Sequence, residues 1–535
     1  MIKARIYYKN GSVSEIDGAC ELEFSDLYPE FEQASFADTK ELEARSFGSM
    51  QLRAKNAVRS LLHSKVNYIA QICISSSVDG VGTICDIVTS VDKNSDFKVL
   101  LSPKRAELFG SSGIEGYMHQ DGIYIMPCSY FNDHPEYLGF MDRALYENKG
   151  IKLILFGDAA DCAQLNMIWP CMAGAVCADL VLEFPVISAL NTMGCLVKSF
   201  AADYGLKDFD SEAIRALCVF ACRQSGDRRY LGLNELTLKS ICAEASNLCN
   251  KELVCSHDVL KAIAARDFRV NFIAESGLRD HKDRQILLCT SGAVVGQING
   301  LSVIETVGTS YEFGEPVRIT ATLRAGGEGD IIDIERKAEL AGQIHAKAMM
   351  IINGFITKEF SSCAPLPVSA SLVFEQSYSE VDGDSASLTG LCAVLSALAN
   401  VPLRQDLAVT GAVDQFGDVQ AVGGVNEKIE GFYKVCRLHG FTGTQGVIIP
   451  QSCINQLVLR PCVVEAVKAG RFHIYTVSHV KEAIKLLTTL DWGDDETAGT
   501  IRNLIATRLY EIGAQNEEEP WWSSFLKIFK KEEQS

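Results

Sequence analysis

Several signals that mark membrane, secreted or zinc-binding proteins are missing from this sequence of 535 residues. No apolar run reaches the roughly 18 residues of a membrane-spanning helix, so we expect no membrane span. The first residues, 1–6, lack an apolar core followed by a small-residue cleavage site, so we expect no signal peptide. The 19 cysteines form no CxxC pair and HExxH is absent, which argues against a metal site. Cysteines scattered in this way suit a reducing compartment, and we expect a cytoplasmic protein.

The charge balance argues against nucleic-acid binding. The formal net charge is -18, so most of the surface would repel a phosphate backbone. A hydrophobic content of 47% with 22% charged residues is typical of globular proteins, and this length predicts more than one domain. We predict an N-terminal segment, an α/β domain, a helical lid, an α+β domain and a C-terminal tail. Their expected ranges are 1–45, 46–205, 206–285, 286–490 and 491–535.

In the front half, apolar segments typical of strands alternate with segments that have a helical pattern. Residues 68–74, 123–126 and 152–157 read as buried strands, and their spacing predicts a parallel α/β layer. Between about 206 and 280 the pattern turns helical, with Asp210 and Ser211 suited to cap a helix. On a later helix, Leu238 to Ala245 place apolar residues on one face.

The first candidate catalytic segment is Asp382-Gly383-Asp384-Ser385-Ala386-Ser387. Apolar residues at helical spacing follow, which predicts an amphipathic helix over 385–400. Gly383 permits a tight turn and Asp384 can cap the helix, which would put Ser385 in the first turn. Backbone N–H groups there could hold an oxyanion beside a serine nucleophile. Taken alone, the segment fits an ordinary helix cap better.

The second segment is Gly423-Gly424-Val425-Asn426-Glu427-Lys428-Ile429, which opens another predicted helix. Lysine has an ordinary pKa of about 10.4 and is a poor base at neutral pH. An apolar cleft could lower the pKa of Lys428 to about 7–8, and the neutral amine could then take the Ser385 proton. Taken alone, this lysine fits a solvated helix start better.

Together the two segments resemble the proteolytic domain of Lon proteases, closest to the B-type Lon branch and its Lon-related bacterial relatives. The likeness covers about 286–488, including Gly296 to Leu301, Phe313 to Pro316, Ile344 to Lys347 and Phe374 to Tyr378. The fold it implies is an AAA+-like α/β module with a helical lid, followed by an α+β Lon proteolytic domain.

The resemblance implies a Ser-Lys dyad of Ser385 and Lys428, with Thr410 beside the lysine and Asp384 adjoining the nucleophile. It also implies a serine endopeptidase that cuts unfolded proteins or peptides inside a closed ring of identical subunits, most simply a hexamer. Neither a metal nor another cofactor enters this chemistry. His345 invites a triad role, but the Lon chemistry does not need it, and we expect it to be structural or substrate-lining.

The nucleotide signatures of an AAA+ module are missing from the front half. A P-loop needs a lysine for the phosphates, whereas the turn at 75–84 has none and carries Asp79. The strand at 123–126 leads into Pro127 and Cys128 where a Walker-B motif has carboxylates. We therefore expect proteolysis without ATP hydrolysis. Two alternatives stay open: an ATP-dependent Lon protease with a divergent nucleotide site, and a catalytically silent Lon-like adaptor.

The C-terminal tail is rich in both aromatic residues and lysines. Trp521, Trp522, Phe525, Ile528 and Phe529 could form one apolar face beside three lysines. Such a segment suits either a membrane surface or docking on protein, and we favour docking.

Overall fold

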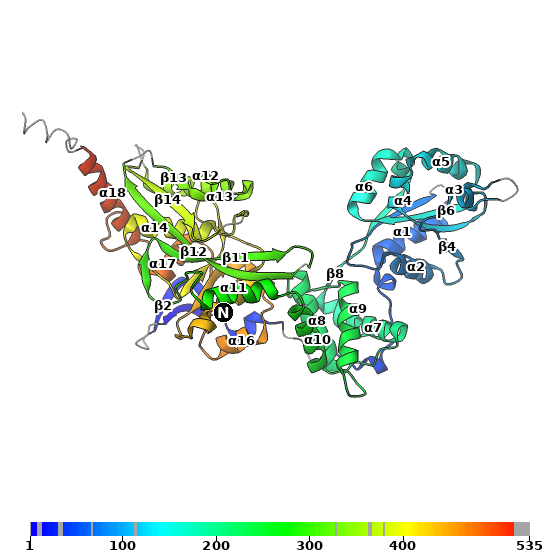
Figure 1. The fold of residues 1–535 in the computed structure, drawn as a ribbon, viewed down its shortest axis with the longest axis horizontal. Helices are drawn as coiled ribbons and strands as arrows, with labels where there is room; N and C mark the ends of the chain where they lie inside the picture. Colours follow the sequence, from blue (N-terminus) through cyan, green and yellow to red (C-terminus); the bar gives the residue numbers. More distant parts are fainter. Residues whose placement is uncertain are drawn as a thin grey trace, which may run out of the picture. The chain divides into compact units, whose positions relative to one another are not determined.

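The structure, a computed structural model, describes residues 2–7, 13–29, 31, 36–65, 68–111, 115–309, 311–326, 329–361, 366–377 and 380–517. The chain divides into two compact units. The split unit consists of Met1–Glu30 together with Asp267–Ser535, and the inserted unit is Phe31–Arg266. In Figure 1 the dark-blue strand β2 accordingly lies among the green to red elements of the split unit.

A parallel sheet of five strands forms the centre of the α/β part of the inserted unit, in the order β4-β5-β6-β3-β7. The strands are β3 (Ile69–Cys73), β4 (Phe97–Val99), β5 (Gly122–Pro127), β6 (Ile151–Gly157) and β7 (Val176–Asp179). The three segments predicted as buried strands are thus β3, β5 and β6, and their parallel pairing is confirmed.

Side chains that alternate along these strands build a core on each face of the sheet. On β5, Tyr124 and Met126 face one core and Ile125 faces the other. The first core is covered by α4 (Cys128–Asp133), α5 (Leu138–Glu147) and α6 (Ala159–Ile168), and the second by α1 (Leu52–His63) and α2 (Gly80–Val91). A short helix, α3 (Arg105–Phe109), lies between β4 and β5 in the chain.

Four helices complete the inserted unit. They are α7 (Val186–Tyr204), α8 (Ser211–Ser225), α9 (Glu235–Leu248) and α10 (Ser256–Phe268). Strands β8 (Glu183–Pro185) and β9 (Tyr230–Gly232), which flank α7 and α8 in the chain, pair antiparallel in a small two-stranded sheet. Asp210 caps α8 as predicted, because its carboxylate accepts a hydrogen bond from Ala213 N at 2.7 Å. The predicted apolar face of α9 is also confirmed, since Leu238, Ile241, Cys242 and Ala245 are buried.

A mixed sheet of nine strands forms the split unit, in the order β1-β2-β20-β19-β16-β11-β12-β14-β13. The strands are β1 (Ile2–Tyr7), β2 (Val13–Glu21), β11 (Gln297–Thr306), β12 (Tyr311–Ala325), β13 (Ile331–Asp333), β14 (Val368–Phe374), β16 (Leu407–Val409), β19 (Gly446–Pro450) and β20 (His473–Val477). Two small ribbons accompany the sheet: β10 (Ala293–Val295) with β15 (Pro402–Arg404), and β17 (Ala412–Val413) with β18 (Val419–Gln420).

The helices of the split unit are α11 (Phe272–Lys282), α12 (Ile334–Lys337), α13 (Gln343–Phe360), α14 (Ser387–Ala399), α15 (Val425–His439), α16 (Pro461–Lys468), α17 (Val480–Thr488) and α18 (Ile501–Glu517). The helix expected over 385–400 was predicted to be amphipathic, with one face exposed. In the structure no face of α14 is exposed, because every one of its residues is buried. A helix with so few charges can be covered on all sides. Its neighbours include α13, α17 and α18, and Arg508 Nη1 donates to Ala397 O at 2.8 Å.

The first two strands close one edge of the nine-stranded sheet, and no sequence pattern predicted them there. Strand β2 pairs antiparallel with β20 through Cys20 opposite Thr476 and Glu21 opposite Tyr475. His473 Nδ1 lies 2.7 Å from a carboxylate oxygen of Glu21, and both side chains are buried. These contacts join parts of the chain about 450 residues apart.

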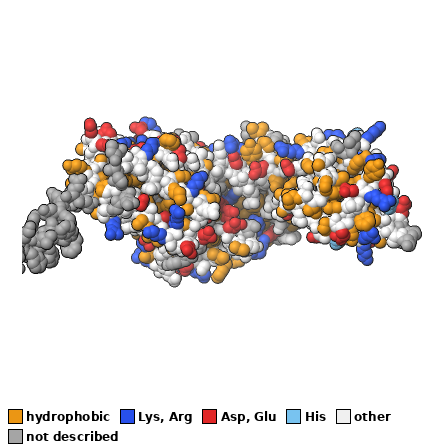
Figure 2. All heavy atoms as spheres, turned by 90° about the horizontal axis from the view of Figure 1, so that it is seen from above, with side chains coloured by type: hydrophobic (Ala, Val, Ile, Leu, Met, Phe, Trp, Pro, Cys, Tyr) orange, Lys and Arg blue, Asp and Glu red, His pale blue; other side chains and the backbone are white. Residues whose placement is uncertain are grey.

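The surface carries charges of both signs. On the face drawn in Figure 2, lysine and arginine side chains lie among aspartate and glutamate side chains and do not gather into one basic patch. Among the residues that the structure describes, no helix is long and apolar enough to span a membrane. The aromatic segment predicted at Trp521 to Phe529 lies outside the described residues.

Candidate active site

Ser385 lies in a turn between β14 and α14. The helix begins only at Ser387, and its N-cap residue is Ala386, which makes no side-chain cap. The expectations that Asp384 caps the helix and that Ser385 sits in its first turn are therefore wrong. The reason is a preceding turn, in which Gly383 adopts φ of 102° and Ser387 N donates to Asp384 O at 2.9 Å. That turn uses the residues that would otherwise start the helix.

The backbone of Ser385 is fixed from the strand side. Its carbonyl oxygen accepts hydrogen bonds from Gly411 N at 2.8 Å and from Thr410 Oγ1 at 3.2 Å. Thr410 follows β16 and is fully buried, and Leu388 N returns a bond to Gly411 O at 3.0 Å. The structure thus brings together Ser385 and Thr410, two of the residues predicted from the sequence.

The backbone amides around Ser385 differ in whether they already donate a hydrogen bond. Those of Ser387 and Leu388 donate to Asp384 O and Gly411 O. Within the described part of the chain, the amides of Ser385 and Ala386 have no acceptor. Two neighbouring donors of this kind can stabilise a negative oxygen close to the serine side chain.

Lys428 lies in the first turn of α15 and its side chain is only 4% exposed. Burial lowers the pKa of Lys428 from its ordinary value to about 8, while the nearby Cys453 thiol and the carboxylates of Asp384 and Glu427 act in the opposite direction. Because the charge of Asp384 acts on this lysine, Lys428 is within electrostatic range of the residue that precedes Ser385. A lysine with a pKa of about 8 has a substantial neutral fraction near neutral pH.

Close packing of β12 against α15 explains the burial. A Cβ on Gly314 would collide with the carbonyl oxygen of Glu427, and one on Gly431 would collide with the backbone of Gly314. The two glycines let the strand backbone reach the helix backbone beside Lys428. Gly424 caps the helix with φ of 64°, and a Cβ there would press on Val303. In the sequence, Gly314 is one residue of the motif Phe313 to Pro316, and nothing in that motif marks this role.

A second residue that sequence reasoning missed is Asn426, which holds the start of α15. Its Nδ2 donates to Gln456 O at 2.8 Å, and its Oδ1 accepts from Val458 N at 2.8 Å. On the same stretch, Cys453 Sγ accepts from Val422 N at 3.4 Å, just before Gly423 and Gly424. These bonds fix the turn that leads into Lys428. The only hint in the sequence is an amide side chain two residues before the lysine.

His345 lies inside the core. It is 1% exposed, its Nε2 lies 3.3 Å from Asp333 Oδ2, and its ring packs edge-on against Phe374. This environment agrees with the structural role expected for it. Within the described ranges, no group of three or more His, Cys, Asp and Glu side chains is arranged to hold a metal ion.

Residues 376–489 match the family described as Lon protease (S16) C-terminal proteolytic domain. This part of the chain is therefore similar to a Lon proteolytic domain. Residues 208–269 match a second family, the AAA+ ATPase LID domain of archaeal LonB. Both candidate catalytic segments, 382–387 and 423–429, lie inside the first match, and α8 and α9 lie inside the second. The resemblance to Lon proteases is confirmed, and the first matched family is one of proteolytic domains.

Several curated proteins are similar to this chain. A Lon protease homolog of Escherichia coli K12 is 40% identical over 384 residues, which cover 71% of this chain and 65% of that protein. A Lon protease homolog of Haemophilus influenzae is 43% identical, with 70% and 63% covered. An archaeal Lon protease of Thermococcus kodakarensis is 28% identical, with 57% and 45% covered. The chain thus spans less than two thirds of the length of these relatives.

Proposed function

We propose that this chain is a Lon-type serine endopeptidase in which Ser385 is the nucleophile and Lys428 the general base. The observation that carries the proposal is a buried lysine with a pKa of about 8, held within electrostatic range of the turn that presents the serine. At neutral pH the neutral form of such a lysine can accept the serine proton, which an ordinary lysine cannot do efficiently.

The reaction follows the logic of Ser-Lys dyads. Lys428 Nζ takes the proton of Ser385 Oγ while the oxygen attacks the peptide carbonyl. The resulting ammonium gives its proton to the leaving amine, and an acyl group stays on Ser385. Lys428, neutral again, then takes a proton from the water that attacks the acyl group, and it returns this proton to Ser385 Oγ as the acyl–oxygen bond breaks and the acid leaves. Each half-reaction therefore starts from the neutral amine.

Two features of the Ser385 turn support this chemistry. The amides of Ser385 and Ala386 can receive the oxyanion of the tetrahedral intermediate. Thr410 and Gly411 hold the Ser385 carbonyl and so set the direction of the side chain. In this proposal Thr410 is a positioning residue, and Asp384 tunes the pKa of Lys428 through its charge.

The proposed substrates are unfolded or damaged proteins and peptides in the cytoplasm. An unguarded Ser-Lys dyad would also cut folded neighbours. We therefore propose a closed homo-oligomeric ring, a hexamer, whose chamber admits only unfolded chains. Light scattering at micromolar concentration measures the assembly, and a fully active monomer would contradict the ring.

Within the proposal, the inserted unit is an AAA+-like module with a helical lid that does not hydrolyse ATP. The loop after β3 lacks a lysine, and its Asp79 accepts a hydrogen bond from Gly82 N at 3.1 Å as the cap of α2. After β5, Cys128 is buried with its Sγ 3.8 Å from Cys162 Sγ, where a magnesium site would need carboxylates. Phosphoryl transfer depends on positioning and charge neutralisation, and these side chains provide neither.

A second candidate is an ATP-dependent Lon protease with a divergent nucleotide site. The match of residues 208–269 to an AAA+ ATPase lid favours it. Phosphate release by the pure protein, with and without casein, separates the two candidates. Casein-stimulated release that disappears when 75–83 is replaced by a neutral linker would establish the second.

The deciding experiment compares casein cleavage by the wild type and Ser385→Ala, each with and without ATP and magnesium. We expect equal cleavage by the wild type in both conditions and none by the variant. Cleavage that persists in purified Ser385→Ala would end the assignment of the nucleophile. A wild type that is silent in all conditions, and that a serine-reactive probe fails to label, would point to an adaptor.

A further inference from the structure

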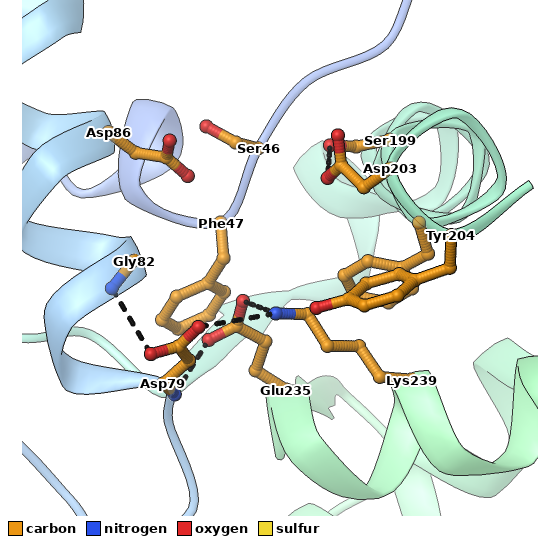
Figure 3. Close-up of a pocket in the computed structure, with 11 residues that line it drawn as sticks. Ser46, Phe47, Asp79, Gly82, Asp86, Ser199, Asp203, Tyr204, Glu235 and Lys239 are labelled. Carbon is orange, nitrogen blue, oxygen red and sulfur yellow. Dashed lines mark hydrogen bonds and ion pairs between the residues drawn. The ribbon is translucent and has the colours of Figure 1, made fainter.

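The inserted unit contains a pocket of about 240 Å³ beside the start of α2. Asp79, Gly82 and Asp86 line it from the loop after β3 and from α2, and Glu235 and Lys239 line it from α9 (Figure 3). Strand β3 is an inner strand of the parallel sheet, with β6 on one side and β7 on the other. Open α/β sheets bind ligands beyond the carboxyl ends of such strands, and phosphates bind at the start of the following helix.

The carboxylate of Glu235 occupies the anion position of this pocket. Its Oε2 accepts hydrogen bonds from Asp79 N at 3.1 Å and from Thr83 Oγ1 at 3.2 Å. Backbone amides and a hydroxyl at a helix start are the donors that a phosphate oxygen would use. Glu235 is only 5% exposed, so little of its surface is open to competing water. The chain itself therefore supplies an anion to the start of α2.

Lys239, one turn further along α9, completes an ion pair. Its Nζ lies 2.9 Å from Glu235 Oε1 and 4.0 Å from Asp79 Oδ2. The same ammonium lies over the rings of Phe200 and Tyr204, at 5.6 and 5.7 Å from their centroids. Burial lowers the pKa of Lys239, but the hydrogen bond and charge of Glu235 outweigh it, and the net shift is upward. The lysine is thus a cation at neutral pH.

A backbone bond also joins α9 to the loop after β3. Leu236 N, in the first turn of α9, donates to Ser77 O at 3.1 Å. Asp86 and Asp203 add two further carboxylates to the pocket lining. The lining therefore holds four carboxylates against Lys239, which disfavours a second anion such as a phosphate.

We propose that Glu235 and Lys239 form an internal latch, in which the glutamate takes the place of a phosphate at the start of α2 and fixes α9 to the loop after β3 without a nucleotide. The proposal deepens the proposed reading of the inserted unit as an AAA+-like module without hydrolysis, and rests on it. It does not depend on whether Ser385 cleaves peptides.

Hydrogen exchange of the full-length protein tests the latch, followed in fragments that cover 75–83 and α9. Glu235→Ala leaves Asp79 N without its acceptor, and a hydrogen bond to a charged group is worth roughly a tenfold to a hundredfold change in opening. We expect exchange at 75–83 to accelerate by about that factor, while β19 and β20 of the split unit do not change. Glu252→Gln, an exposed carboxylate of the same unit, is the matched control and should match the wild type.

Two further variants keep the test decisive if Glu235→Ala loses its fold. Glu235→Gln keeps an acceptor oxygen and loses the charge, so it should accelerate exchange less. Lys239→Met should accelerate exchange, and adding it to Glu235→Gln should add little, because the pair acts as one unit. Unchanged exchange at 75–83 in both single variants would overturn the latch.

Adding magnesium and ADP to the wild type separates the latch from a nucleotide site. We expect no added protection at 75–83 and no binding of a fluorescent ADP. Protection of this loop by ADP would show that a phosphate displaces Glu235, and the latch would then be wrong. Cleavage of a short peptide, measured in the same samples, tests the serine peptidase separately, so either proposal can fail alone.

Discussion

The pKa of Lys428 makes a quantitative prediction about the pH dependence of cleavage. Only the neutral amine can take the Ser385 proton, so the rate follows the neutral fraction of this lysine. With a pKa of about 8, about one tenth of the molecules carry a neutral Lys428 at pH 7. A lysine at the ordinary value of 10.5 would be neutral in about 3 of 10,000 molecules, so burial raises the active fraction about 300-fold.

The expected profile is an ascending limb with its midpoint near pH 8. Below the midpoint, kcat/KM should rise about tenfold per pH unit, and it should level off above about pH 9. The assay is cleavage of a short fluorogenic peptide below its KM, at constant ionic strength from pH 6 to 10. A short peptide diffuses to the site, so unfolding of the substrate does not limit the rate. Intrinsic fluorescence of the enzyme over the same range checks that the fold persists.

A charge variant tests whether the limb belongs to Lys428. The carboxylate of Asp384 raises the pKa of Lys428, so Asp384→Asn should move the limb to lower pH. Glu380→Gln, which removes an exposed carboxylate from the same loop, is the control and should leave the limb in place. A flat profile from pH 6 to 9 would refute the lysine base. If Asp384→Asn leaves the midpoint of the limb unchanged, the titrating group is not Lys428.

Three further outcomes follow from the same site. Ser385→Ala and Lys428→Ala should each reduce casein cleavage to background, and the double variant should lose nothing more, since the two residues act as one unit; an additive loss would contradict the dyad. Thr410→Val removes a hydrogen bond of 3.2 Å to Ser385 O, and kcat for the short peptide should fall by about fivefold, while a complete loss would mean a direct catalytic role. Lys428→Met should stabilise the fold by up to about 3 kcal/mol at pH 7, because the folded chain disfavours the ammonium form. That gain is complete below about pH 8 and disappears as the pH rises towards 10.5, so equal shifts in urea midpoints at pH 7 and pH 10 would contradict the burial argument.

The sequence predicted best those elements whose pattern is local. Strands β3, β5 and β6 are apolar runs because helices cover both faces of a parallel sheet. The cap of α8 at Asp210 also depends only on neighbouring residues. The hairpin of β1 and β2 was missed, since its place depends on β20, whose register with it no local pattern encodes.

The candidate site divides in the same way. Ser385 and Lys428 were proposed from two short motifs, but the burial that lowers the pKa of Lys428 comes from Gly314 and Gly431 on separate elements. The start of α14 was placed two residues too early, because the turn at Gly383 competes with the helix. Glu235 gave no signal at all, since its role needs a loop about 150 residues earlier in the chain.

The pairing of β2 with β20 has a consequence for how the protein is made. At roughly 5–20 residues per second, a ribosome needs on the order of 20 to 90 s to pass from Cys20 to Thr476. During that time the first hairpin has no partner and must stay unpaired, while Phe31–Arg266 can already fold. A hairpin alone is marginally stable, and an open strand edge invites wrong partners. Newly made chains should therefore depend on chaperones until β20 emerges, and expression without 2–21 should leave the β20 edge open to aggregation.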